Sequence, residues 1–334
     1  MLGRLLRRGS APVMPEPDRD MALDDRELRA ARGLAVAGDW AAARDIVATA
    51  GADWERRGLR LKVLAEAAPQ DAGGWLDAWL LDAPDDPIAV TLNAAALSDR
   101  AGKARGAAPA AQTSEEQFRS FAELSERSHA EAVRALTLAP DDPMPCTILL
   151  GSMFAVRDQR GAFREVLAEA RRRDRYNFDA HWTAVNFQCE KWFGSHRAMF
   201  DLARETASEA PAGSGVTMLP LFAHLEYAMR QYCWGKVSRD GLINCRRYFQ
   251  RDDVQRELDA CVTKWRSPGP PVHARALVCE NWLAVAYALS GRRDECAAVF
   301  GRIGPYVASH VWAYFFGSTV GGFVANWKWA NRVR

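Results

Sequence analysis

A short phrase that ends one helix and begins the next occurs twice in this chain, and it limits the fold more than any other feature. Residues Ala83–Pro87 and Ala139–Pro143 both read APDDP. In each copy an aspartate can cap the following helix while the last proline occupies its first turn. Comparable breaks follow near Tyr176–Asn177 and at Pro211, so that breaks recur about every 35 residues.

Between these later breaks, apolar residues recur at helical spacing and are interrupted by one short turn. The unit is a helical hairpin of about 34 residues, which is the period of tetratricopeptide repeats. Because one hairpin cannot bury its own apolar face, it needs a neighbour stacked on it. We therefore predict an all-α fold, a tetratricopeptide-like α-solenoid of stacked helical hairpins.

Earlier in the chain the same arrangement is predicted with less regular spacing. A helix that ends at Gly38–Asp39 is followed by one that starts at Trp40, and a helix from Trp54 is followed by one from Trp75. The stretch 101–113 is rich in glycine, alanine and basic residues, and it predicts a long loop inside a helical pair.

Changes in composition divide the chain into three parts. Residues 1–22 are basic, rich in proline and without periodicity, which predicts a flexible lead. Residues 23–266 form the predicted repeat array. The break at 267–271 separates it from residues 271–334, where we predict one more hairpin and an aromatic cap.

The last part of the array is less regular. Residues 219–232 and 254–265 predict helices, and residues 234–240 predict the turn between them.

Charge and cysteine content limit the class of function. The formal net charge is only +2, whereas a sequence-blind nucleic-acid binder needs a strong basic excess, so no nucleic-acid partner is expected. The chain has seven cysteines, an odd number, with no C-x-x-C pair and no recognisable signal peptide. Free thiols in a reducing cytoplasm are the expectation.

The C-terminal segment 306–325 is long enough to span a membrane and carries no Asp, Glu, Lys or Arg. Its glycines, serines, threonine and histidine lower the hydropathy, so we predict a buried element and no membrane span, with membrane contact as the less favoured alternative. The aromatic cluster that includes Trp312, Trp327 and Trp329 is either a cap on the last hairpin, which we favour, or an exposed docking surface.

From about Gly102 onward, over two thirds of the chain, the sequence resembles uncharacterised helical-repeat proteins of actinobacteria and other bacteria, catalogued as a domain of unknown function. The motifs that carry the resemblance are Arg105–Gly106, Ser114–Glu116, Phe118–Leu124, Leu138–Pro143, Cys189–His196, Ala210–Ser214 and Ala223–Glu226. The motif around Trp192 is the most specific, although Phe193 stands where that family tends to have a second glycine. The resemblance implies an all-helical fold, no assigned activity and no catalytic residues to transfer.

The residue pairs that could carry chemistry are poorly spaced for it. His181 and Cys189 lie about 12 Å apart along one predicted helix, too far for a nucleophile and its base. His224 and Glu226 point in different directions on a helix, and Glu226 with Arg230 has the spacing of a surface ion pair.

Signature motifs give no stronger signal. The sequence contains no H-E-x-x-H, G-x-S-x-G or phosphate-binding glycine loop, so no catalytic residue, metal or cofactor is expected. The basic run 171–175 is typical of a solvated helix end, with a site for phosphate or an acidic partner as the alternative.

The leading hypothesis is a non-catalytic scaffold that binds a protein or peptide in a groove lined by the first helix of each hairpin. The residues predicted to contact this partner are His181, Asn186, Glu190, Trp192, His224, Tyr227, Arg230 and Arg105. The alternative is an enzyme or small-molecule-binding protein with a pocket between the Arg105 loop and the Trp192 turn, where Arg105 would contact an anion.

Overall fold

The computed structural model describes residues 13–69, 73–106, 108–155, 160–267, 269, 272–308 and 310–333, and within them the protein is all-α. Helices account for 73% of the chain, and the described residues form no strand, only one isolated β-bridge. The α-helices are α1 Arg26–Val36, α2 Trp40–Ala48, α3 Trp54–Ala67, α4 Trp75–Asp82, α5 Pro87–Arg105, α6 Glu115–Leu138, α7 Met144–Ser152, α8 Arg160–Arg173, α9 Phe178–Phe187, α10 His196–Glu209, α11 Leu219–Ala228, α12 Arg239–Phe249, α13 Asp252–Arg266, α14 Ala276–Ser290, α15 Arg293–Ile303, α16 Val311–Phe316 and α17 Thr319–Ala330.

Local capping explains where many of these helices begin. The carboxylates of Asp25 and Asp53 accept hydrogen bonds from the first-turn amides of α1 and α3. Ser114 and Gln117 form a reciprocal capping box at the start of α6. The hairpin boundaries predicted at Gly38–Asp39 and before Trp75 are confirmed, because α1 to α4 begin and end at these positions.

Two predicted boundaries were wrong. Residues 101–105 belong to α5, so the connection to α6 begins only at Gly106. The turn predicted at 234–240 ends earlier, because α12 begins at Arg239 after its N-cap Ser238, whose hydroxyl accepts from Gly241 N. In both cases tertiary packing favours helix: α5 packs along α6, and α12 packs against α14.

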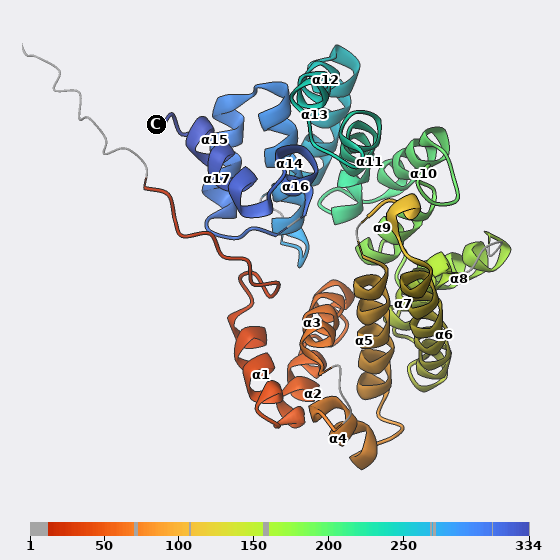
Figure 1. The fold of residues 1–334 in the computed structure, drawn as a ribbon. Coiled ribbons are helices and arrows are strands. Elements are labelled where there is room, and N and C mark those ends of the chain that lie inside the picture. The colour runs from red at the N-terminus through yellow and green to blue at the C-terminus, as the bar shows by residue number, and fades with distance from the viewer. Residues whose placement is uncertain are drawn as a thin grey trace, which may run out of the picture.

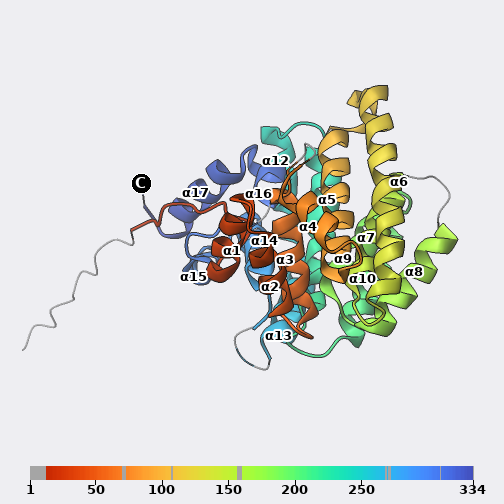
Figure 2. The same ribbon diagram turned by 90° about the horizontal axis from the view of Figure 1, so that it is seen from below.

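The helices form two halves (Figure 1). Helices α1 to α8 lie in the lower half and α10 to α17 in the upper half, with α9 between them; Figure 2 shows the same helices from below. The largest buried core extends from Phe178 to Ala330, and a second core extends from Ala22 to Met144. The larger core includes side chains from both sides of the break at 267–271, so α13 and α14 share one interior.

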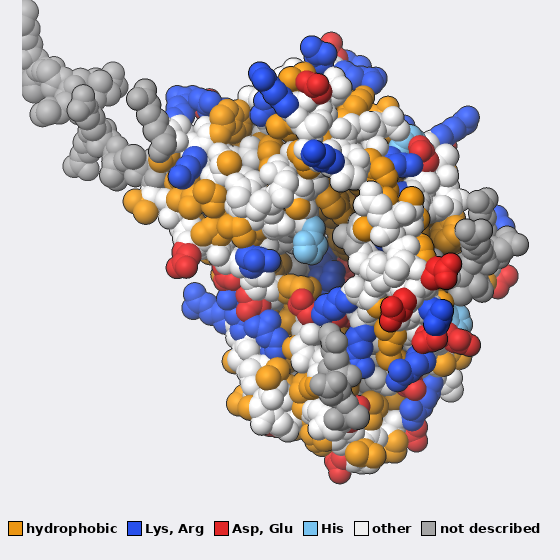
Figure 3. Space-filling view, viewed as in Figure 1, with side chains coloured by type: hydrophobic (Ala, Val, Ile, Leu, Met, Phe, Trp, Pro, Cys, Tyr) orange, Lys and Arg blue, Asp and Glu red, His pale blue; other side chains and the backbone are white. Residues whose placement is uncertain are grey.

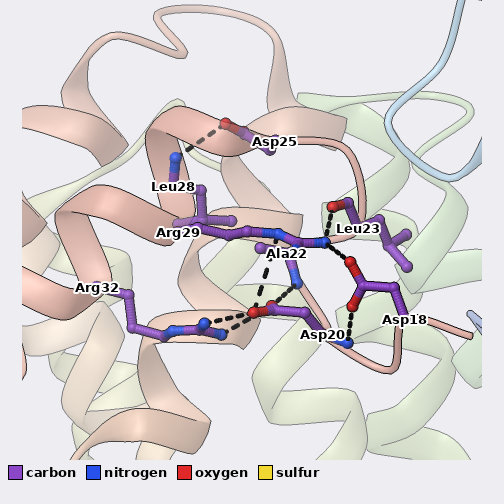
Figure 4. A network of polar contacts seen from close by, with 8 residues as sticks. All are labelled: Asp18, Asp20, Ala22, Leu23, Asp25, Leu28, Arg29 and Arg32. Atoms are coloured by element: carbon purple, nitrogen blue, oxygen red, sulfur yellow. Dashed lines mark hydrogen bonds and ion pairs between the residues drawn. The ribbon is translucent and has the colours of Figure 1, made fainter. Parts of the chain in front are cut away.

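The N-terminal segment before α1 crosses from the lower half to the C-terminal helices. Residues 1–12 of the predicted lead lie outside the described residues. Asp18 N donates to Pro305 O (2.7 Å) and Val307 N donates to Asp18 O (2.8 Å), which fixes this segment beside the end of α15. The carboxylates of Asp18 and Asp20 also pair with Arg29 (2.7 Å) and Arg32 (2.6 Å) of α1 (Figure 4). The segment therefore links the first helix of the chain to the last third.

The C-terminal aromatic cluster is buried. Trp312, Phe315 and Phe323 are inaccessible to solvent, and Trp312 stacks on Phe300 of α15 with ring centroids 5.7 Å apart. These three rings are therefore buried, and the prediction that they cap a repeat array stays a prediction. Among the described residues, no helix is both long and apolar enough to cross a membrane.

Candidate interaction surface

A tight turn between α9 and α10 presents the motif around Trp192. The amides of Trp192 and Gly194 both donate to Cys189 O (3.0 and 3.3 Å). A Cβ on Gly194 would lie 2.2 Å from Gln188 O, so only glycine fits there. Ser195 then caps α10 by accepting from Ala198 N. The turn consequently places Glu190 and Trp192 on the surface next to the first residue of α10.

The end of α11 supplies the opposite side of this surface. After Ala228 the helix widens into a π-helical turn, Met229–Cys233, before it ends at Trp234. π-Helical turns are rare and are frequent at functional sites, because they change the direction in which successive side chains point. This turn carries Arg230 and Gln231 toward the Trp192 turn.

Polar contacts join the two sides. Arg230 Nη2 lies 3.4 Å from Glu190 Oε1, and His196 Nε2 lies 2.7 Å from Glu190 Oε2. The Gln231 amide is 2.6 Å from His196 Nε2, and the Tyr227 ring packs edge-on against the His196 ring.

Arginine–aromatic stacking extends the surface at both ends. Arg230 lies over the Trp234 ring at 4.6 Å from its centroid. Arg105 lies over both Trp192 and Phe118, at 5.5 and 5.9 Å. Trp234 and Phe118 are 39% and 40% exposed, so both rings remain accessible.

The connection from α5 to α6 lies near the end of the π-helical turn, because Pro109 Cγ is 4.0 Å from the position that a Cβ would take on Gly235. We call this set the Arg105–Trp234 surface. Its members are Arg105, Phe118, Glu190, Trp192, His196, Tyr227, Arg230, Gln231 and Trp234.

The residues predicted from sequence divide between this surface and the interior. Arg105, Glu190, Trp192, Tyr227 and Arg230 belong to the surface. Asn186 is half-buried, and its Nδ2 donates to Trp182 O.

His181 and His224 are buried and hydrogen-bonded within the protein. Neither histidine belongs to the Arg105–Trp234 surface, although His181 lines the separate hollow between α8 and α10. Glu226 is also buried and pairs with Lys191 (2.7 Å), so the surface pair of Glu226 with Arg230 is wrong: helix α11 turns residue 226 inward and Arg230 pairs with Glu190 instead.

His181 is neutral because of its surroundings. Its Nε2 donates to Arg175 O (2.9 Å), and its Nδ1 lies 3.3 Å from the Thr206 hydroxyl, which donates to it. Burial lowers the pKa of His181 to about 4. Burial raises the pKa of the Cys189 thiol, and its sulfur lies 3.3 Å from Met199 Sδ. The pair therefore has no nucleophile for acyl-transfer chemistry.

A hollow of about 250 Å³ lies between the ends of α8 and α10. It is lined by Arg171, Arg172, Arg175, Tyr176, His181, Thr206 and Glu209. Two of its three arginines have acidic partners, since Arg172 makes two 2.8 Å bonds to Glu169 and Arg175 lies 3.7 Å from Glu209. This pairing favours the solvated helix end over a phosphate site for the basic run 171–175.

A second polar network surrounds His224. Its Nδ1 is 2.6 Å from the Tyr248 hydroxyl and its Nε2 is 3.0 Å from Glu257 Oε2. Burial raises the pKa of Tyr248, so this phenol keeps its proton and is not an activated nucleophile. Burial also disfavours the charged form of Glu257, but hydrogen bonds from Arg204 and His224 outweigh it and lower the pKa of Glu257 to about 2. The network joins α11, α12 and α13 and has a structural role.

This lowered pKa predicts how acid destabilises the protein. Glu257 is charged in the folded state down to about pH 2, whereas its ordinary pKa is 4.5. Its stabilising contribution is therefore full above pH 4.5 and is lost as the pH falls from there toward 2. E257Q should lower the free energy of unfolding by about 1–3 kcal/mol at pH 7. Urea unfolding at pH 7, 5, 4 and 3 should show that the difference in free energy of unfolding between wild type and E257Q becomes smaller as the pH falls. A difference that stays constant would contradict the prediction, and E205Q, at an exposed glutamate of α10, is the control.

Metal binding and reactive thiols receive no support in the described residues. They contain no group of three His, Cys, Asp or Glu side chains placed to hold a metal ion. All seven cysteines are buried and free. The sulfurs of Cys233, in the π-helical turn, and Cys245, in α12, are 3.6 Å apart.

Sequence reasoning missed four members of this surface, Phe118, His196, Gln231 and Trp234. Gln231 shows no sequence signal, because a π-helical turn has no distinct pattern. Trp234 lies in the turn predicted at 234–240, and a large aromatic residue in a predicted turn is a signal that could have identified it.

Comparison with protein-family models, with curated proteins and with solved structures found no match for this chain. The comparisons thus identify no family, and the resemblance to bacterial helical-repeat proteins stays a prediction.

Proposed function

We propose that this protein is a non-catalytic scaffold of the tetratricopeptide-like kind, which binds a peptide or partner protein through the Arg105–Trp234 surface. The observation that carries the proposal is the pair of accessible aromatic side chains, Phe118 and Trp234, each of which stacks with an arginine. Trp, Tyr and Arg are the residues that most often dominate the binding energy of protein interfaces.

The spacing of the helices supports the repeat part of the proposal. Helix α7 begins at Met144 and α9 at Phe178, about 34 residues later, and each packs against the helix that follows it. Helices α7 and α9 also contact each other, as the first helices of stacked hairpins do.

The surface is already organised for binding. Glu190 holds Arg230, and the Trp192 ring holds one face of Arg105, so little side-chain entropy is lost when a partner docks. The charges of Glu190 and Arg230 offset one another, which favours a partner that offers an apolar or aromatic side chain to Trp234 with polar groups around it.

The alternative, a small-molecule pocket between the Arg105 loop and the Trp192 turn, is less favoured. The two segments do meet, but Arg105 Nη1 donates to the loop carbonyls of Gly106 and Ala108 (3.0 and 2.6 Å). Stacking on Trp192 and Phe118 occupies Arg105 further. These bonds and the stacking hold the guanidinium of Arg105 against its own loop, although its Nε is buried without a hydrogen-bond partner. Protection of this loop from proteolysis by a metabolite would favour the pocket.

The proposal predicts a large effect of W234A on binding and a small one on stability. A photoreactive amino acid at position 234, introduced in the native host, should crosslink to one specific protein, and the same group at Leu81 should not. Leu81 is the control because it is 84% exposed and lies on α4, in the lower half.

The binding of that protein to purified W234A should then be weaker by about 30-fold, as expected for a hot-spot residue, whereas L81A binds normally. Equal binding by both variants would place the interface elsewhere.

A further inference from the structure

A narrow cleft lies where the N-terminal segment meets α3 and the start of α14. It is lined by Arg19, Met21, Leu23, Leu59, Lys62, Arg275, Val278, Val307 and Ala308. Its lining contains three cationic side chains and no acidic one. Figure 3 shows the face of Figure 1 hollowed between the two halves, with Lys and Arg side chains gathered at the hollow.

Lys62 is the least compensated of these cations. Among the described residues its ammonium group makes no hydrogen bond or ion pair, and it lies 5.5 Å from the centroid of the Trp182 ring. The side chain is exposed to solvent along the cleft, while protein surrounds its ammonium group. Burial, followed by the positive charge of Arg275, lowers the pKa of Lys62.

Arg275 is the buried wall of the cleft. It is 3% exposed, and its Nη2 pairs with Asp179 of α9. Its Nε is buried without a hydrogen-bond partner. A buried N–H without a partner costs free energy, and an acceptor in the cleft would relieve that cost.

Arg19 completes the set from the N-terminal segment. It is exposed and makes no ion pair or hydrogen bond within the described part of the chain. The carboxylates of Asp179, Asp99 and Glu66 act on Lys62 electrostatically, but none of them makes an ion pair with it. Asp179 is already used by Arg275, and burial raises the pKa of Glu55, whose Oε1 accepts from Phe178 N (2.6 Å).

We propose that this cleft binds a small oxyanion, a phosphate or carboxylate group, held between Lys62, Arg275 and Arg19. The cleft volume of about 70 Å³ leaves room for such a group and its waters but is well below the roughly 300 Å³ of sites for whole cofactors or nucleotides. Arginine and lysine together recognise such groups by charge-assisted hydrogen bonds.

The position of the cleft gives binding a structural consequence. Its three cations come from the N-terminal segment, α3 and the residue before α14, so a bound oxyanion connects three parts of the chain. The N-terminal segment is otherwise held by the pairing of Asp18 with residues 305 and 307 and by the ion pairs to α1 shown in Figure 4. Binding should therefore protect this segment.

The test uses the full-length protein with sodium phosphate and sodium acetate as separate probes, against sodium chloride at equal ionic strength. The wild type should show a saturable rise in melting temperature with at least one oxyanion, and trypsin cleavage after Arg19 should slow with the same concentration dependence. A rise in melting temperature with phosphate alone would identify a phosphate site, and a rise with acetate alone would identify a carboxylate site.

The variant K62M should weaken the response about tenfold or more, whereas K328M, which removes an exposed lysine of α17, should leave it unchanged. R19M changes an exposed residue and serves as the second variant should K62M not fold. The proposal is overturned if the wild type shows no response beyond chloride, or if K62M and R19M respond like the wild type.

Discussion

D142A should lower the free energy of unfolding by about 3–5 kcal/mol, although the residue lies in a connection between two helices. Asp142 is only 3% exposed, and its Oδ2 lies 2.6 Å from Nε of Arg57, which is also buried. Its other oxygen accepts from Met144 N at the start of α7. Alanine leaves the Arg57 guanidinium buried without a counter-ion and removes the acceptor for the first amide of α7 at the same time.

The chain offers a matched control in its own sequence. Asp86 occupies the same place as Asp142 in the other APDDP phrase, where it caps α5 by accepting from Ile88 N and contacts Trp79 Nε1. D86A removes a cap and one weak hydrogen bond without stranding a buried charge, so it should cost only about 1–2 kcal/mol. Urea unfolding monitored by circular dichroism measures both variants.

The double variant R57M/D142A tests the mechanism. Since no buried charge is left unpaired, it should be more stable than D142A alone. If the costs of R57M and D142A simply add, the ion pair is not the source of the effect and the prediction fails.

W282A should also lower the free energy of unfolding by about 3–5 kcal/mol. The Trp282 side chain is 2% exposed and lies at the centre of an aromatic group drawn from three helices. Its ring centroid is 5.7 Å from Phe178 of α9, 6.0 Å from Trp182 of α9 and 5.0 Å from Phe222 of α11. Alanine would leave a cavity that this rigid set of rings cannot fill, so α14 would lose its main contact with α9 and α11.

Trp234 is the natural comparison, because it is also a tryptophan but lies on the surface. W234A should change the free energy of unfolding by about 0.5 kcal/mol or less in the same measurement, as is usual for surface positions. If both variants lowered the free energy of unfolding by similar amounts, the aromatic group around Trp282 would not be what stabilises the packing of α14 on α9 and α11.

The two proposals are independent of each other. The Arg105–Trp234 surface depends on exposed aromatic side chains and tolerates loss of the oxyanion cleft, which lies between the N-terminal segment and α14. Variant K62M should therefore keep the crosslink at position 234, and W234A should keep the response to oxyanions.

The helical pattern of the chain could be read from sequence because it depends on local forces. Helical spacing of apolar residues, capping aspartates and glycine turns act over a few residues, and they placed α1 to α4, α9 and α13 to α15 close to where they are found. The failures at 101–105 and at α12 are places where packing against a distant helix outweighs weak local preference.

The candidate sites depended on which side chains meet across the fold. Glu190 and Arg230 are forty positions apart and meet because the Trp192 turn and the π-helical turn face each other. Lys62 and Arg275 are much further apart in sequence, and only the folded chain places both cations in one cleft. The same applies to His181 and His224, which look like candidate ligands in the sequence and are buried in the structure.

The repeated APDDP phrase shows most clearly which properties the sequence determines and which the tertiary structure determines. Sequence alone determined that both copies would end one helix and help to start another, because capping and the fixed φ of proline are local properties. Tertiary structure alone decided that Asp142 would face a buried arginine while Asp86 would face an indole N–H. The free energy of each contact depends on burial and on a partner far away in the chain, and neither is a property of the five residues themselves.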